Sequence, residues 1–208
     1  MVPSIILICV AAYLLGNLNG AVVISRLVAK EDVRTHGSGN AGLTNFVRNY
    51  GSATSVFVIL IDVGKAVAAC LVGGLLLKRY GYYTEGVALG GLFVIFGHDF
   101  PALLGFKGGK GILSGCIIAF TIDWRIGALI LGVFLLAYLL TQYVSLGSVL
   151  ASVAFGVGFI VFHHDNLVVM LCGIFMSALA VYMHRGNIVR LVKGNERKTN
   201  LFGKGEKR

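Results

Sequence analysis

The stretch ATSVFVILIDVGKAVAACLVGGLLL, residues 53–77, is apolar apart from short polar side chains and two charged residues, Asp62 and Lys65. A run of about 20 apolar residues is long enough to cross the hydrocarbon core of a bilayer as a helix. The stretch therefore predicts a membrane-spanning helix. Its two charges stand three residues apart, so they share a helix face and are expected to pair, as buried charges in lipid normally do. The alternative is a role for this pair in a functional site.

Similar apolar runs recur along the whole chain. Of its 208 residues, 57% are hydrophobic and only 13% are charged, whereas about a quarter of a soluble domain is charged. We therefore expect an all-α integral membrane protein, a single membrane-embedded domain over 1–208 with about seven transmembrane helices. The fourth expected span is short for a perpendicular crossing. The expected spans are 3–24, 53–77, 85–105, 111–122, 126–142, 145–162 and 166–183.

The distribution of lysine and arginine predicts the orientation, because these residues accumulate in cytoplasmic loops. Of the 18 lysines and arginines, fourteen fall in one set of expected loops and three in the opposite set, while Lys65 lies within a span. The N-terminus is therefore expected outside and the C-terminus in the cytoplasm. The net charge of +9 requires no nucleic-acid partner, since the basic tail 184–208 faces anionic membrane lipids. The sequence gives no indication of an oligomeric state.

Polar side chains gather on the same predicted cytoplasmic face, in loops 25–52, 97–111 and 143–148. The first of these loops contains HGSGNAGLTNFVR, residues 36–48. Gly37 and Gly39 lack a Cβ and leave backbone N–H groups open to an anion, and a guanidinium such as that of Arg48 grips phosphate with two parallel hydrogen bonds. The alternative is an ordinary glycine- and asparagine-rich connection. Further donors in the loop are Ser38, Asn40, Thr44 and Asn45.

The second polar segment is FGHDFPALLGFKGGKG, residues 96–111. Lys107 and Lys110 stand among Gly108, Gly109 and Gly111, so the backbone can approach an anion that the two ammonium groups neutralise. The alternative is that the lysines only anchor the chain at the membrane surface. His98 is a candidate general base or phosphate donor, and the alternative is a structural histidine.

The third polar segment is MHRGNIVRLVKGNERK, residues 183–198. His184 and Asn187 share a helical face if the last span continues through them, and Glu196 is expected to pair with neighbouring cations. The cations of this segment can also serve as a membrane anchor. The sequence contains no His-x4-Asp pair, no aspartate cluster suited to magnesium and no zinc-ligand spacing, so no metal and no cofactor is expected.

The three segments, in this order, resemble the signatures of the bacterial acyl-phosphate:glycerol-3-phosphate acyltransferases, the PlsY family. GSGNAGLTNFVR is similar to G-S-G-N-x-G-A-T-N-x-x-R, and SLGS at 145–148 resembles a short motif between the fifth and sixth spans. The resemblance implies a multi-pass protein of the bacterial inner (plasma) membrane with its active site facing the cytoplasm. It also implies transfer of an acyl group from fatty acyl phosphate to the 1-hydroxyl of glycerol 3-phosphate, with lysophosphatidic acid and inorganic phosphate as products.

The resemblance implies roles for individual residues as well. The base that accepts the hydroxyl proton stays open between His98, His184 and a substrate phosphate oxygen. A membrane transporter of phosphate or an organophosphate is the rival function, although only Asp62 and Lys65 place charge within a span and no internal repeat is evident. The implied catalytic residues are Ser38, Arg48, His98, Lys110, His184 and Asn187. The implied substrate-binding residues are Gly37, Gly39, Asn40, Thr44, Asn45, Lys107, Gly108, Gly109, Gly111 and Ser145.

Overall fold

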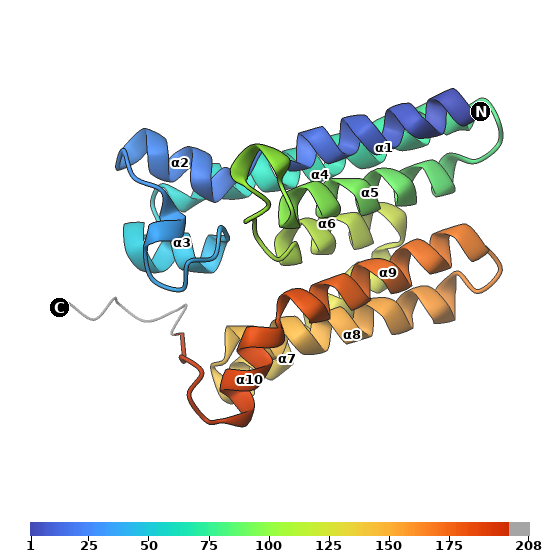
Figure 1. Ribbon diagram of the computed structural model, residues 1–208. Coiled ribbons are helices and arrows are strands. Elements are labelled where there is room, and N and C mark those ends of the chain that lie inside the picture. Colours follow the sequence, from blue (N-terminus) through green and yellow to red (C-terminus); the bar gives the residue numbers. More distant parts are fainter. Residues whose placement is uncertain (200–208) are drawn as a thin grey trace.

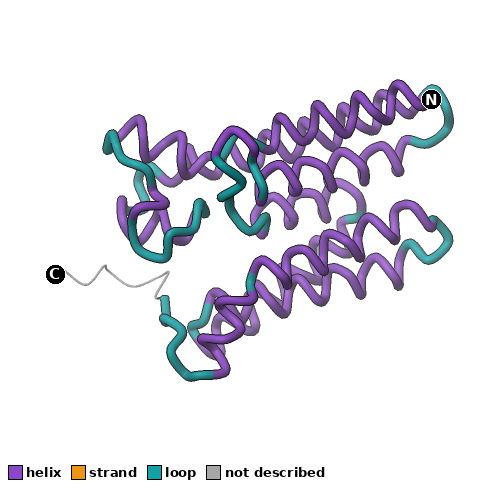
Figure 2. The backbone as a smooth tube through the Cα atoms, viewed as in Figure 1, coloured by secondary structure: helices purple, strands orange, loops and turns teal. Residues whose placement is uncertain are grey.

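The computed structural model describes residues 1–199, and every regular element within this range is helical (Figures 1 and 2). Five segments are apolar and long enough to cross a membrane, and a sixth is present if two helices bent by 54° at His184 count as one. The prediction of an all-α integral membrane protein is therefore confirmed. The helices are α1 (Val2–Gly16), α2 (Gly20–Val28), α3 (Leu43–Tyr50), α4 (Ser55–Lys78), α5 (Tyr83–Asp99), α6 (Ile112–Ile122), α7 (Trp124–Thr141), α8 (Val144–Phe162), α9 (Leu167–Met183) and α10 (Arg185–Val192), with 3-10 turns η1 (Val33–Thr35) and η2 (Ala102–Leu104).

The expected fourth span corresponds to α6, which is apolar but has only 11 residues. At 1.5 Å per residue it extends about 16 Å, roughly half of a hydrocarbon core about 30 Å thick. The count of seven crossings and the orientation of the termini therefore stay predictions. The expected first span is divided into α1 and α2, because the Asn19 side chain accepts a hydrogen bond from the Val22 N–H and starts a new helix.

Glycine contacts bring the helices close together. A Cβ on Gly86 of α5 would collide with the backbone of Gly73 on α4, so the two backbones touch where neither residue has a side chain. Small residues of this kind allow membrane helices to approach closely. Helices α1, α4 and α5 pack against one another, α7, α8 and α9 form a second group, and α5 joins the groups by contacting α9 (Figure 1).

The two charges of the α4 sequence form the expected ion pair. Lys65 Nζ lies 2.8 Å from Asp62 Oδ1, and the two side chains are 1% and 4% exposed. The prediction of a paired buried charge is thus confirmed, and both residues also contact His98, which is described below.

The polar segments gather at one end of the bundle. Helices α2, α3 and α10 lie at the end opposite Met1, whereas the turns α4–α5 and α8–α9 lie at the end that holds Met1 (Figure 1). A small separate core, formed mainly by Val22, Val33, Phe46 and Val58, fastens α2, η1 and α3 to the end of α4. This arrangement holds the loop 36–42 as a fixed platform at the polar end.

Candidate active site

The side chain of Asn45 organises the glycine-rich loop. Its Oδ1 accepts the Ser38 N–H at 3.0 Å, and its Nδ2 donates to the carbonyls of Val33, His36 and Asn40 at 3.0–3.1 Å. Asn45 is 3% exposed. Buried backbone groups need partners, and these contacts occupy the amide completely. In the structure the Asn45 side chain therefore shapes the loop, and its expected contact with a substrate stays a prediction.

Ser38 stands at the tip of that loop. It is exposed, and its hydroxyl has no hydrogen-bond partner among residues 1–199. Gly37 and Gly39 on either side have φ of 60° and 72°, the left-handed region that glycine adopts at little cost. The sequence placed flexible backbone here correctly, and the structure leaves the Ser38 hydroxyl available to a ligand.

Arg48 and Thr44 lie on α3, which begins directly after Gly42. The Arg48 guanidinium contacts the hydroxyl of Thr199, so the chain after α10 returns to α3. Burial first, and the positive charge of Arg197 second, lower the pKa of Arg48. An anion bound here would relieve this crowding of cations.

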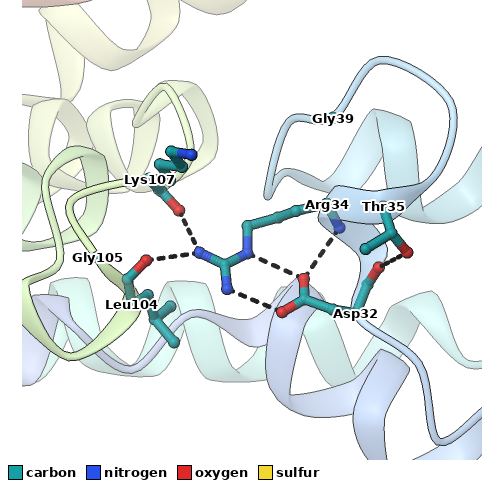
Figure 3. A pocket seen from close by; sticks show the side chains of 7 residues that line it. All are labelled: Asp32, Arg34, Thr35, Gly39, Leu104, Gly105 and Lys107. Atoms are coloured by element: carbon teal, nitrogen blue, oxygen red, sulfur yellow. Dashed lines mark hydrogen bonds and ion pairs between the residues drawn. The ribbon is translucent and has the colours of Figure 1, made fainter.

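The glycine-rich loop and the segment before α6 are joined by Arg34, which sequence analysis did not assign to the site. Its Nη1 donates to the carbonyls of Leu104 at 2.7 Å and Lys107 at 2.9 Å (Figure 3 shows the Lys107 contact). Asp32 accepts from the same guanidinium at 2.8 Å, and Arg34 in turn holds the pKa of Asp32 well below its usual value. The Asp-x-Arg spacing at 32–34 is the sequence signal for this clamp.

A groove of about 560 Å³ lies between the two clamped segments (Figure 3). Lys107 and Gly39 stand on opposite sides of it, and the Ala41 N–H reaches the Gly108 carbonyl at 3.4 Å below. Asn40 lies in this loop and bonds Asn45 through its backbone carbonyl. Two motifs that are far apart in the sequence thus form the two sides of a space large enough for a small organophosphate.

The segment 108–111 lies against His98 at the end of α5. The Gly109 N–H donates to the His98 carbonyl at 3.0 Å, and a Cβ on Gly109 would collide with the ring Nε2 of His98. A Cβ on Gly108 would collide with the His98 carbonyl, and Gly111 has φ of 65°. The KGGKG segment therefore requires its glycines for close approach to this histidine.

Lys110 turns the other way, toward α10. Its ammonium donates to Asn187 Oδ1, and Asn187 Nδ2 donates to Glu196 at 3.2 Å. Arg190 pairs with the same carboxylate at 2.9 Å, so the expected ion pair of Glu196 is confirmed. Burial, followed by the charge of Arg190, lowers the pKa of Lys110 to about 8. The Glu196 carboxylate thus lies beside the cations Lys110 and Arg190. A phosphate group, which is also an anion, would suit the same cluster.

His184 lies between α9 and α10, and α9 ends at Met183, where the expected last span ends. The chain bends by 54° where the apolar sequence gives way to His-Arg-Gly-Asn. The ring Nδ1 lies 2.8 Å from the Ala180 carbonyl. A carbonyl only accepts, so Nδ1 carries the proton and Nε2 of the neutral ring keeps a lone pair. His184 thus has the form that a general base requires.

Ser145 lies in the first turn of α8 and not in a loop, since α8 begins at Val144. Its buried Oγ has no hydrogen-bond partner in the described part of the chain. Helix α8 contacts α10, the helix that holds Asn187. No group of three or more histidine, cysteine, aspartate or glutamate side chains within residues 1–199 is placed to hold a metal ion.

Comparison with known proteins identifies the family to which this arrangement belongs. A family model described as glycerol-3-phosphate acyltransferase matches residues 6–194. A glycerol-3-phosphate acyltransferase of Clostridioides difficile is 38% identical over 199 residues, 94% of this chain and 95% of the relative. One of Thermoanaerobacter pseudethanolicus is 36% identical over 193 residues, 93% and 94% of the two chains.

Two solved structures have the same fold. The glycerol 3-phosphate form of PlsY (YgiH), an integral membrane glycerol 3-phosphate acyltransferase, superposes with a TM-score of 0.86 at 32% identity, covering 96% of this chain and 100% of that one. The lysophosphatidic acid form of the same protein gives 0.81 at 32% identity, covering 95% and 96%. The chain is therefore an integral membrane acyltransferase and belongs to the glycerol-3-phosphate acyltransferase family.

Proposed function

We propose that the chain transfers the acyl group of a fatty acyl phosphate to the 1-hydroxyl of sn-glycerol 3-phosphate. The products are 1-acyl-sn-glycerol 3-phosphate and inorganic phosphate. The reaction takes place at the cytoplasmic face of a bacterial inner membrane, where a water-soluble acceptor meets a lipid-soluble donor. The observation that carries the proposal is the meeting of three anion-binding segments at one polar end of an apolar bundle (Figure 1).

Two phosphate groups enter the reaction, and the site offers two cationic regions for them. Lys107 lies in the groove beside the open loop of Ser38 and Gly39, which suits the phosphate of glycerol 3-phosphate. Lys110 and Arg190 flank the Asn187 amide, which suits the acyl phosphate. The solved structures of PlsY are a glycerol 3-phosphate form and a lysophosphatidic acid form, which supports the same acceptor and product for this chain.

The chemistry needs one proton acceptor and donors for a developing negative charge. The glycerol hydroxyl attacks the acyl carbon, its proton passes to a base, and the tetrahedral oxyanion collapses with departure of phosphate. We assign the base to His184, whose Nε2 holds a free lone pair. Ser38 and Lys110 supply donors to the oxyanion or the departing phosphate, and one such donor contributes about 3 kcal/mol in other enzymes.

The test is direct. The purified protein in detergent receives acyl phosphate and glycerol 3-phosphate, and lysophosphatidic acid and released phosphate are measured, with acyl-CoA as the comparison donor. Stoichiometric formation of both products from acyl phosphate is the expected result. Absence of product from acyl phosphate, or equal use of acyl-CoA, would contradict the proposed donor.

A further inference from the structure

A buried chain of polar groups runs beneath the glycine loop of the site. Lys65 Nζ on α4 lies 2.8 Å from Asp62 Oδ1, 2.7 Å from the Leu18 carbonyl and 2.7 Å from Nδ1 of His98 on α5. A longer contact of 3.4 Å reaches the Gly16 carbonyl. His98 is 4% exposed. The lysine thus links three elements, and its three short contacts match the three N–H donors of an ammonium.

These contacts determine which nitrogen of His98 holds the proton. A carboxylate and a carbonyl only accept hydrogen bonds, and an ammonium only donates them. The carboxylate of Asp62 stabilises the charged form of Lys65. Nδ1 of His98 must therefore accept from Lys65, and in the neutral ring the proton resides on Nε2. Asp62 Oδ1 is 3.8 Å from Nδ1, too far to take a hydrogen bond from it.

Nε2 of this ring faces the KGGKG segment. A Cβ built on Gly109 would meet Nε2 before any other atom, and the next two atoms in its way belong to the same ring. The His98 carbonyl holds the Gly109 N–H at 3.0 Å, which fixes the segment over the ring. Among residues 1–199, Nε2 has no hydrogen-bond partner. Nε2 therefore lies against Gly109, within the segment that the proposed function assigns to the phosphate of glycerol 3-phosphate.

We infer that Lys65, itself held by Asp62, is a positioning residue that fixes His98 as an Nε2–H donor to the phosphate of glycerol 3-phosphate. His98 then binds substrate and takes no proton from it. The inference rests on the proposed function for the identity of the anion, but the state of the ring is independent of any turnover. The buried Asp62–Lys65 ion pair thus has a role in the binding site, because it holds the ring of His98 against the KGGKG segment.

Nitrogen NMR of the protein labelled with ¹⁵N-histidine tests the state of the ring without substrate. His98 signals are assigned by their loss in His98→Gln, and the chain has only 5 histidines. The expected result is an unprotonated Nδ1 and a protonated Nε2. Addition of glycerol 3-phosphate should shift the Nε2 signal. A protonated Nδ1, or an Nε2 signal unmoved at saturating glycerol 3-phosphate, would overturn the inference.

Kinetics separate positioning from proton transfer. Lys65→Met leaves Asp62 buried and unpaired, which is strongly destabilising, so the paired variant Asp62→Asn/Lys65→Met is used beside it. Loss of one hydrogen bond to a charged group should raise KM for glycerol 3-phosphate about tenfold or more, with kcat changed less than about threefold. His98→Gln should do the same. A fall in kcat at unchanged KM would make His98 the base and overturn the inference.

The two proposals fail in different ways. A fixed Nε2–H ring in a protein that forms no lysophosphatidic acid would contradict the proposed function and leave the state of His98 standing. Active protein in which the paired variant keeps the wild-type KM and the wild-type ring state would overturn the positioning role alone.

Discussion

His98 and His184 turn the same ring nitrogen, Nδ1, toward the protein, but in opposite hydrogen-bond roles. Nδ1 of His184 lies 2.8 Å from the Ala180 carbonyl and must donate, whereas Nδ1 of His98 lies 2.7 Å from the Lys65 ammonium and must accept. The two histidines therefore offer a substrate different groups, a lone pair in one case and an N–H in the other. Sequence analysis treated them as equivalent candidates for the base.

His184→Gln should lower kcat with little effect on KM. Removal of a general base costs about 10²- to 10⁴-fold, and we expect a loss of at least about 100-fold for acyl transfer to glycerol 3-phosphate. His163→Gln, at the opposite end of the bundle, is the control. If kcat of His184→Gln fell by less than about tenfold, His184 would not be the base, and a substrate phosphate oxygen would be the proton acceptor.

The activity of the free enzyme should depend on the charge of Lys110. Burial lowers the pKa of this lysine to about 8, so its ammonium is lost as pH rises through that value. We expect kcat/KM to fall above about pH 8, because the neutral amine no longer attracts phosphate. Lys110→Arg keeps the charge and should move this decline above about pH 10. A decline at the same pH in the variant would show that another group titrates; Lys78→Arg, far from the site, is the control.

Ser38→Ala should remove activity without unfolding the protein. The hydroxyl contacts no described group, so the substitution costs no internal hydrogen bond, and the loss falls on the ligand alone. We expect kcat/KM to fall at least about 100-fold with an unchanged thermal unfolding midpoint. Ser52→Ala is a matched control, since Ser52 is also exposed and uses only its backbone carbonyl. Activity that survives Ser38→Ala would remove Ser38 from the site.

The sequence predicted an integral membrane protein with its polar segments at one end. This was possible because the length of each apolar run and the distribution of lysine and arginine between the loops can be read directly from the sequence. The open backbone of loop 36–42 could also be predicted, since glycine flanks Ser38 on both sides. Contacts between distant segments could not be predicted from the sequence. The clamp of Arg34 on Leu104 and Lys107, and the contact of Lys65 with His98, depend on tertiary packing. The Asp-x-Arg spacing at 32–34 indicates a local ion pair, but no local pattern identifies the distant partners of Arg34 or Lys65.

The bend at His184 and the contacts of Asn45 also depend on tertiary structure and could not be predicted from the sequence. The sequence left open whether a helix continues past Met183, and in the structure the ring of His184 bonds to Ala180 and the chain turns there. The amide of Asn45 suits a ligand as well as it suits a backbone. Only the positions of the loop carbonyls decide between these uses, and a sequence does not give those positions.

Asn45→Ala should therefore reduce stability and activity together, unlike Ser38→Ala. The substitution removes the side chain that donates to the carbonyls of Val33, His36 and Asn40. At about 1 kcal/mol for each hydrogen bond, we expect the free energy of unfolding to fall by about 3 kcal/mol. Thermal unfolding in detergent measures this loss, and KM for glycerol 3-phosphate should rise as the loop loses its shape. Asn49→Ala, one turn further along α3, removes contacts only to Asn45 and should have a smaller effect. If Asn45→Ala kept the wild-type unfolding midpoint but lost activity, Asn45 would be a direct substrate donor, as its sequence context first indicated.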